Sequence, residues 1–194
     1  CNCKKNKNLY TKKNSYWENR NQTTDEKDIT KELSKKKIKH NNILHIGIGN
    51  SEFGIFFSEN NNVCGISISQ NEIDYAKKLN LKQYEVYFID KYSINFQFLL
   101  SNGPFDYIID TNLKSYTCCQ KSFNFMLDNI FKLLKKGGQL ITSRKGMKWS
   151  KKLKPKLSFN LKHFFHFKLK EIDGDPQNQL DISELELFCK KKKN

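Results

Sequence analysis

Arginine and alanine are nearly absent from this chain of 194 residues. It contains 2 arginines and 1 alanine against 33 lysines and 22 asparagines, so its formal net charge of +15 comes almost entirely from lysine. Arginine binds phosphate and guanine through paired hydrogen bonds, and its scarcity argues against a dedicated nucleic-acid surface. We interpret the charge as a solvated, lysine-rich surface of the kind that an AT-rich genome encodes. A surface for nucleic acid or for an anionic membrane is the alternative interpretation.

Long apolar runs and metal-binding motifs are also missing. No stretch of 18 apolar residues is present, so the sequence predicts no membrane-spanning helix. The first forty residues lack the apolar segment of a secretory signal, so we expect a cytoplasmic protein with free thiols. None of the 6 cysteines forms a C-x-x-C pair, and His163 and His166 have no carboxylate or thiol beside them. No metal site is therefore predicted.

Apolar segments alternate with amphipathic segments along most of the chain. The predicted strands are residues 43–46, 63–68, 84–89, 105–110 and 139–142. The predicted helices are residues 25–37, 51–59, 70–79, 94–100 and 119–135, the last ended by Gly137 and Gly138. This alternation predicts an α/β fold with a parallel sheet and helices on both faces. Two final strands, residues 164–172 and 184–190, are too close in sequence for a crossover helix, so we expect them to be antiparallel.

The most informative motif is a glycine pair at the end of the first predicted strand. The segment Gly47-Ile48-Gly49-Asn50-Ser51 follows an apolar run and precedes a helix. Glycine permits a tight turn and lets a ligand approach the main chain. In an open parallel sheet, ligands bind at the carboxyl ends of the strands. The motif therefore predicts a ligand site at this end of the sheet.

Several further segments lie where one enzyme family has its sequence motifs. They are residues 63–69, 88–90, 105–110 and 133–141, together with Tyr16-Trp17 and Arg20 upstream. With the glycine pair and the order of elements, residues 43–190 resemble the class I S-adenosylmethionine-dependent methyltransferases. The resemblance implies a Rossmann-like seven-stranded sheet, mostly parallel with an antiparallel terminal strand, and S-adenosyl-L-methionine as cofactor. The subfamily is not assigned.

The resemblance also implies a set of site residues. The residues expected to bind the cofactor are Gly47, Gly49, Asn50, Ser51, Ser67, Ile68, Asp90, Asp110, Asn112 and Leu113. Among them, the glycine loop corresponds to the carboxypropyl end, Ser67 and Ile68 to ribose and adenine, and Asp90 to the adenine amine. Asp110, Asn112 and Leu113 follow the fourth strand, where the methyl group is expected. The residues expected at the acceptor are Lys114, Tyr116, Tyr16 and Trp17.

Three positions depart from the family pattern. His45 stands where the first motif has an acid, and Ser51 stands where that motif has its third glycine. Ser67 stands where relatives carry the ribose-binding acid. A carboxylate makes stronger, charge-assisted hydrogen bonds than a hydroxyl does. We therefore expect Ser67→Asp to tighten cofactor binding roughly tenfold, unless another group such as Glu72 reaches the ribose.

The predicted function is methyl transfer to a small-molecule acceptor by in-line displacement, with no identified catalytic base. One alternative is a protein lysine or RNA methyltransferase, in which the basic segment 144–156 would guide an acidic partner. The others are a non-catalytic scaffold that has lost its cofactor and a nicotinamide dehydrogenase. The absence of H-x-D, Cys-Pro and N-P-P-Y strings argues against the common nucleic-acid base methyltransferases. We expect a polar lead-in at residues 1–42 with a helix and a candidate lid. The methyltransferase domain is expected at residues 43–190 and a basic tail at residues 191–194.

Overall fold

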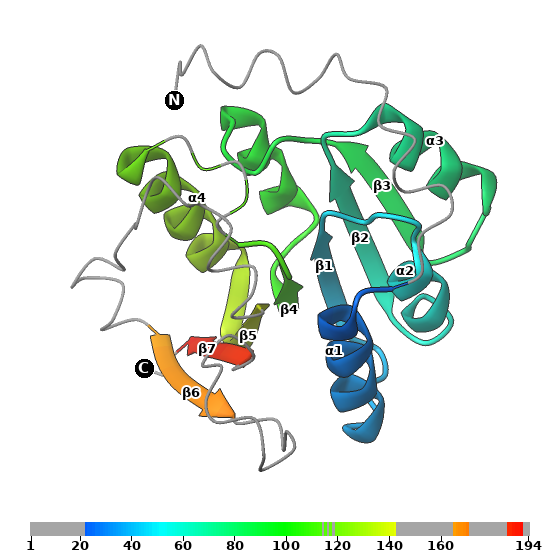
Figure 1. Ribbon diagram of the computed structural model, residues 1–194, viewed down its shortest axis with the longest axis horizontal. Coiled ribbons are helices and arrows are strands. Elements are labelled where there is room, and N and C mark those ends of the chain that lie inside the picture. The colour runs from blue at the N-terminus through cyan, green and yellow to red at the C-terminus, as the bar shows by residue number, and fades with distance from the viewer. Residues whose placement is uncertain are drawn as a thin grey trace.

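The computed structural model describes residues 22–113, 115, 117, 119–142, 165–170 and 186–191, the last two segments by their backbone. Five strands form a parallel sheet in the order β3-β2-β1-β4-β5 (Figure 1). They are β1 (Asn42–Ile46), β2 (Asn62–Ser67), β3 (Tyr84–Phe88), β4 (Phe105–Ile109) and β5 (Leu134–Thr142). The predicted parallel α/β sheet is confirmed. Because the chain moves outward from β1 to β3 and then returns beside β1 with β4, the strand order reverses between β1 and β4.

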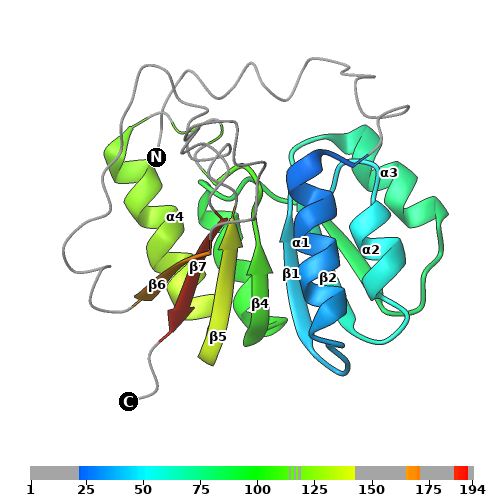
Figure 2. The ribbon, with the colours of Figure 1, turned by 60° about the horizontal axis from the view of Figure 1, so that its bottom comes forward.

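Two more strands extend the sheet beyond β5. The strand β7 (Glu186–Lys191) pairs antiparallel with β5, and β6 (Phe165–Lys170) pairs antiparallel with β7. The views in Figures 1 and 2 place them on the side of the sheet opposite β3. The sequence segment expected to turn between them, around residues 174–176, lies outside the described residues.

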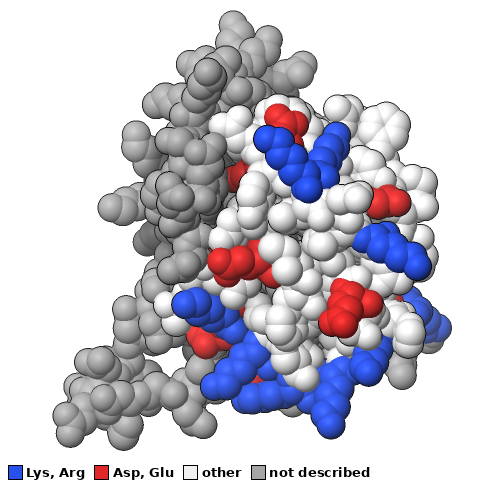
Figure 3. Space-filling view, turned by 90° about the vertical axis from the view of Figure 1, so that its right-hand side faces the viewer, with Lys and Arg blue, Asp and Glu red and all other residues white. Residues whose placement is uncertain are grey.

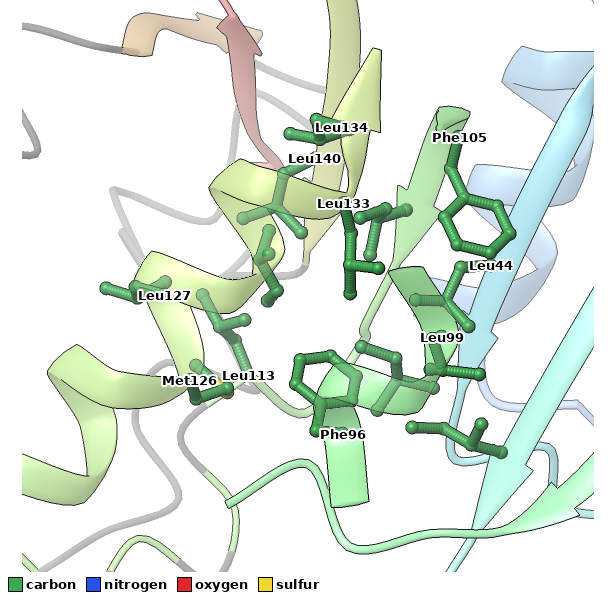
Figure 4. Packing of buried hydrophobic residues seen from close by; sticks show 14 of the residues in the cluster. Leu44, Phe96, Leu99, Phe105, Leu113, Met126, Leu127, Leu133, Leu134 and Leu140 are labelled. Carbon is green, nitrogen blue, oxygen red and sulfur yellow. The ribbon is translucent and has the colours of Figure 1, made fainter. Parts of the chain in front are cut away.

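Helices cover both faces of the sheet, as the sequence predicts. The helices are α1 (Thr24–Lys35), α2 (Glu52–Phe57), α3 (Gln70–Lys78), the 3₁₀ helix η3 (Ile94–Ser101) and α4 (Gln120–Leu133). On one face, apolar residues of α1, α2 and α3 form a buried cluster with side chains of the sheet. On the other face, η3 and α4 form a second cluster (Figure 4). The two clusters leave both ends of the strands for loops, and the loops at the carboxyl ends form the candidate site.

The helix α1 belongs to this packing although it precedes the sheet. It begins with a capping box, in which Thr23 and Glu26 satisfy each other's backbone N–H groups. Ile29 and Leu33, four residues apart on one face, are each 1% exposed. Both belong to the same buried cluster as Ile43 of β1. The N-terminal helix therefore packs against the sheet as part of the core.

The boundary between α4 and β5 differs from the prediction. The sequence predicts a helix to residue 135 that Gly137 and Gly138 terminate, but α4 ends at Leu133 and β5 begins at the next residue. Leu134 is buried and pairs with Phe105 of β4, which draws the chain into the sheet. A Cβ atom on Gly138 would lie 2.8 Å from the Phe105 carbonyl oxygen. This glycine therefore permits a close approach of two strands at an irregular register and does not end the helix.

Candidate active site

The carboxyl ends of β1 and β4 flank the point where the strand order reverses, which is where open α/β sheets bind ligands. The glycine loop follows β1 at this point. Gly47 and Gly49 have φ angles of +81° and +52°, a left-handed region that favours glycine. The N–H of Gly47 donates to the Ile66 carbonyl oxygen of β2 at 2.8 Å, which anchors the loop to the sheet.

The space beside Gly47 is open to a ligand. Gly47 is exposed, and a Cβ atom built on it would meet no heavy atom of the described residues within 4 Å. A bound molecule can therefore approach the main chain closely at this point. The loop thus fits the cofactor expected there, since a side chain at position 47 would enter the space that the ligand needs.

Ser51 lies at the end of the glycine loop but contacts protein. It is fully buried with φ of +63°, and its Oγ accepts a hydrogen bond from the Tyr84 hydroxyl at 3.2 Å. The ring of Tyr84 lies so close to Gly54 and Gly65 that an added Cβ would meet it at 2.5 Å and 3.0 Å respectively. These two glycines and Tyr84 therefore hold Ser51 in place. No sequence pattern points to Tyr84, since it is 33 residues from Ser51 in the chain.

Asn50 links the loop to the segment before α1. Its side-chain amide donates to Glu52 Oε1 at 2.8 Å. The other carboxylate oxygen of Glu52 accepts from the backbone N–H of Gln22 at 3.3 Å. The chain upstream of α1 therefore reaches the glycine loop at Gln22. Tyr16 and Trp17, which the sequence places at the acceptor, lie outside the described residues.

An acidic group, the Glu72 carboxylate, lies at the end of β2. The Ser67 hydroxyl donates to the Glu72 carboxylate at 2.6 Å, and its Oγ accepts from the N–H of Ser69 at 3.0 Å. Ser67 and Glu72 are 6% and 7% exposed. Glu72 lies in α3, so its carboxylate comes from the helix that follows the strand and not from the strand itself. Ile68, next to Ser67, is half-buried.

This geometry reverses the expected effect of an acid at position 67. We expect Ser67→Asp to weaken cofactor binding roughly tenfold, because two carboxylates in contact repel and desolvation penalises both. The matched control is Ser67→Ala, which removes the hydroxyl without adding charge and should weaken binding less. Calorimetric titration with S-adenosylhomocysteine measures both variants. Tighter binding by Ser67→Asp would show that the aspartate reaches the ligand and that Glu72 moves aside.

Asp90 follows β3 in a tight turn. Its Oδ1 accepts from the N–H of Tyr92 at 2.9 Å, and its carbonyl oxygen accepts from the N–H of Ser93 at 2.9 Å. These contacts fix the turn at the carboxyl edge of the sheet and hold a half-buried carboxylate there. Its role toward the adenine amine stays a prediction.

The residues after β4 are tied to the residues after β3. The Lys91 ammonium lies 2.7 Å from Asp110 Oδ2 and also donates to the carbonyl oxygens of Asn112 and Leu113. Asp110 Oδ1 accepts from the N–H of Asn112 at 3.0 Å. The Leu113 side chain is buried in the cluster beneath α4. Asn112 is exposed, whereas Lys114 and Tyr116 lie outside the described residues. No sequence pattern distinguishes Lys91, because it is one lysine among 33.

His45 of β1 occupies the family's acid position as a neutral core residue. It is 2% exposed, its ring centroid lies 4.7 Å from that of Phe53, and its Nδ1 has no hydrogen-bond partner within the described part of the chain. Burial lowers the pKa of His45 from 6.5 to about 4. The imidazole is therefore uncharged near neutral pH, and its position supplies no acidic group to the site.

The buried imidazole predicts a loss of stability in acid. Since the folded-state pKa lies below the unfolded value, the unfolded chain binds the extra proton between about pH 6.5 and about pH 4. The free energy of unfolding should fall through this window, by up to about 3 kcal/mol. Urea denaturation of the wild type and of His45→Leu at several pH values measures the difference. Equal pH dependence in the two proteins would contradict the prediction.

The findings on metal sites, membrane-spanning helices and buried thiols hold for the described residues alone. Among them, no group of three or more His, Cys, Asp or Glu side chains is placed to hold a metal ion. None of the helices in the described ranges has the length and apolar character needed to cross a membrane. Cys64 is a small core residue, and burial raises the pKa of its thiol to about 12.

A family model described as a methyltransferase domain matches residues 37–181, which is most of the chain. The chain belongs to this methyltransferase-domain family. No curated protein matches it significantly. The enzyme is an S-adenosylmethionine-dependent methyltransferase, and its cofactor is S-adenosylmethionine. The family membership confirms the resemblance seen in the sequence, and the enzyme class replaces the scaffold and dehydrogenase alternatives.

Solved structures share the fold of this methyltransferase at low sequence identity. The N-methyltransferase NodS from Bradyrhizobium japonicum, in complex with S-adenosyl-L-homocysteine, has a TM-score of 0.63 and 14% identity over 88% of this chain and 89% of its own. A TehB-like SAM-dependent methyltransferase from Corynebacterium glutamicum has a TM-score of 0.59 and 17% identity, over 84% and 86%. An rRNA methylase from Streptococcus thermophilus has a TM-score of 0.56 and 12% identity, over 86% and 95%. At such identities the likeness shows the fold alone.

Proposed function

We propose that this methyltransferase acts on a small-molecule acceptor. The observation that supports the proposal is the charge of the loops at the carboxyl edge. The described segments that follow β1 to β4, residues 47–51, 68–69, 89–93 and 110–113, contain a single lysine. That lysine is Lys91, which is buried in an ion pair. A site that docks RNA is expected to present several exposed cations, because phosphate contacts supply most of the affinity.

The described lysines lie mainly at the opposite edge of the sheet. Lys35, Lys36, Lys37 and Lys39 precede β1, and Lys77, Lys78 and Lys82 precede β3. In Figure 3 the basic side chains gather mainly toward the lower edge of the face, with carboxylates among them. This edge holds the amino ends of β1 and β2 in Figure 1. Lysines at the amino edge would not attract a nucleic acid to the candidate site at the carboxyl edge. Their placement therefore supports a small-molecule acceptor.

The cofactor is proposed to lie across the glycine loop and the ends of β2 to β4. Gly47, Gly49 and Asn50 would hold its carboxypropyl end, and Ser67 with Glu72 would face the ribose. The half-buried Asp90 turn would face the adenine amine. When bound, the cofactor supplies a methyl group on a positively charged sulfur, which is a good leaving group. The protein's own task is to align the acceptor and to exclude water, and such alignment contributes ~7–11 kcal/mol in favourable cases.

The wider architecture is part of the same proposal. The antiparallel pairing of β6 and β7 beside β5 supports a seven-stranded methyltransferase sheet. The contact between Gln22 and Glu52 supports a role for the upstream segment over the site, as a lid would have. The catalytic domain then comprises α1 together with the predicted residues 43–190, because α1 packs into the same core, and β7 takes in Lys191 from the predicted basic tail.

The alternative is a protein lysine or RNA methyltransferase. The rRNA methylase among the similar structures shows that this fold can accommodate that activity. One experiment separates the two: incubation with radiolabelled S-adenosylmethionine and a cell extract that has been divided by size. Label in the low-molecular-weight fraction supports our proposal. Label confined to RNA or protein, or sub-micromolar RNA binding at physiological salt, would favour the alternative.

A further inference from the structure

The buried ion pair between Lys91 and Asp110 lies at the carboxyl edge of the sheet, in the region assigned to the cofactor. The two side chains are 8% and 1% exposed, and the ammonium lies 2.7 Å from the carboxylate. The ammonium also donates to the Asn112 carbonyl oxygen at 2.9 Å and to that of Leu113 at 3.2 Å. An ammonium has three protons. These three acceptors use all of them, so Lys91 has no proton left to offer a substrate.

The two charges come from different walls of the site. Asp110 is the first residue after β4, the strand that pairs with β1 at the point where the strand order reverses. Lys91 follows β3, which is separated from β4 by β2 and β1. The chain after β3 runs to η3 on the α4 side of the sheet (Figure 1), and this path brings the ammonium to Asp110. A buried carboxylate beside the point where the strand order reverses is thereby neutralised by a dedicated cation.

We propose that Lys91 balances the charge of Asp110 at the methyl end of the cofactor site. Because the pair has no net charge, it does not favour the positively charged sulfur of S-adenosylmethionine over the neutral sulfur of S-adenosylhomocysteine. The protein therefore binds the cofactor and its product with similar affinity. This inference rests on the proposed placement of the cofactor. An unbalanced carboxylate would stabilise the positive sulfur in the bound state. That stabilisation fades as the methyl group leaves, so it would raise the barrier. In this role Lys91 is a positioning residue and does not contact the acceptor.

Three variants test the charge balance, with S-adenosylmethionine and S-adenosylhomocysteine as probes in calorimetric titrations. Lys91→Met leaves the carboxylate alone and should shift the affinity ratio about tenfold toward S-adenosylmethionine. Asp110→Asn leaves the ammonium alone and should shift the ratio about tenfold the other way. The double variant Lys91→Met/Asp110→Asn removes both charges, and its ratio should return to within about twofold of the wild type.

The opposite directions distinguish electrostatics from damage to the fold. A purely structural role weakens both probes alike and leaves their ratio unchanged. The double variant is also expected to fold, since it leaves no unpaired buried charge, and thermal denaturation checks each protein. A shift in either single variant in its expected direction, reversed in the double variant, supports the proposal. Any other pattern overturns it. A wild type that binds neither probe would overturn the proposed cofactor site itself.

Discussion

Replacing Gly47 by valine is expected to lower the affinity for S-adenosylmethionine at least about a thousandfold while the chain remains folded. The space beside Gly47 is open among the described residues, so the new side chain meets none of their atoms at its Cβ but occupies the ligand's approach to the main chain. The φ angle of +81° adds backbone strain. Such strain costs about 1–3 kcal/mol, less than the stability of a typical domain.

A second glycine provides the matched control for this strain. Gly137 has φ of +82° but lies at the start of β5, at the amino end of the sheet. Gly137→Val should cost similar stability and leave the dissociation constant unchanged. Calorimetry measures binding of both variants, and thermal denaturation measures their stability. If Gly47→Val still bound the cofactor with wild-type affinity, the site would lie elsewhere.

The largest loss of stability is expected from Phe96→Ala. Phe96 is fully buried in η3 and packs in one cluster with Leu44 of β1, Ile108 of β4 and Met126 of α4 (Figure 4). Removal of the ring loses apolar burial and leaves a cavity between the sheet and α4. The expected cost is about 3–5 kcal/mol in the free energy of unfolding. Tm should fall by roughly 6–20 °C for a chain of this size.

Phe98 tests the specificity of that effect. It lies two residues along the same 3₁₀ helix and is 72% exposed. Phe98→Ala therefore removes the same atoms without a cavity and should change stability by less than about 0.5 kcal/mol. Urea denaturation of the two variants gives the comparison. Equal losses would mean that η3 does not pack as described.

Which protein groups the side chains of the candidate site contact could not be predicted from the sequence. Ser51 and Ser67 were expected to face the cofactor, yet the hydroxyl of each contacts the protein. Ser51 meets Tyr84 and Ser67 meets Glu72. Glu72 was named as a possible replacement for the missing acid at the end of β2, and α3 brings its carboxylate to the Ser67 hydroxyl. Such pairs depend on how neighbouring elements are seated, which a linear pattern does not contain.

The amino-acid sequence by itself determined the order of elements, the parallel sheet and the glycine loop. These follow from local properties: the period of apolar residues, and the freedom of Gly47 and Gly49 to adopt positive φ. Only the tertiary structure decided the start of β5, where burial and strand pairing of Leu134 override a local glycine signal. It also decided the pairing of Lys91 with Asp110. Those residues lie 19 apart in the chain, and only the return of η3 to the α4 face brings them together.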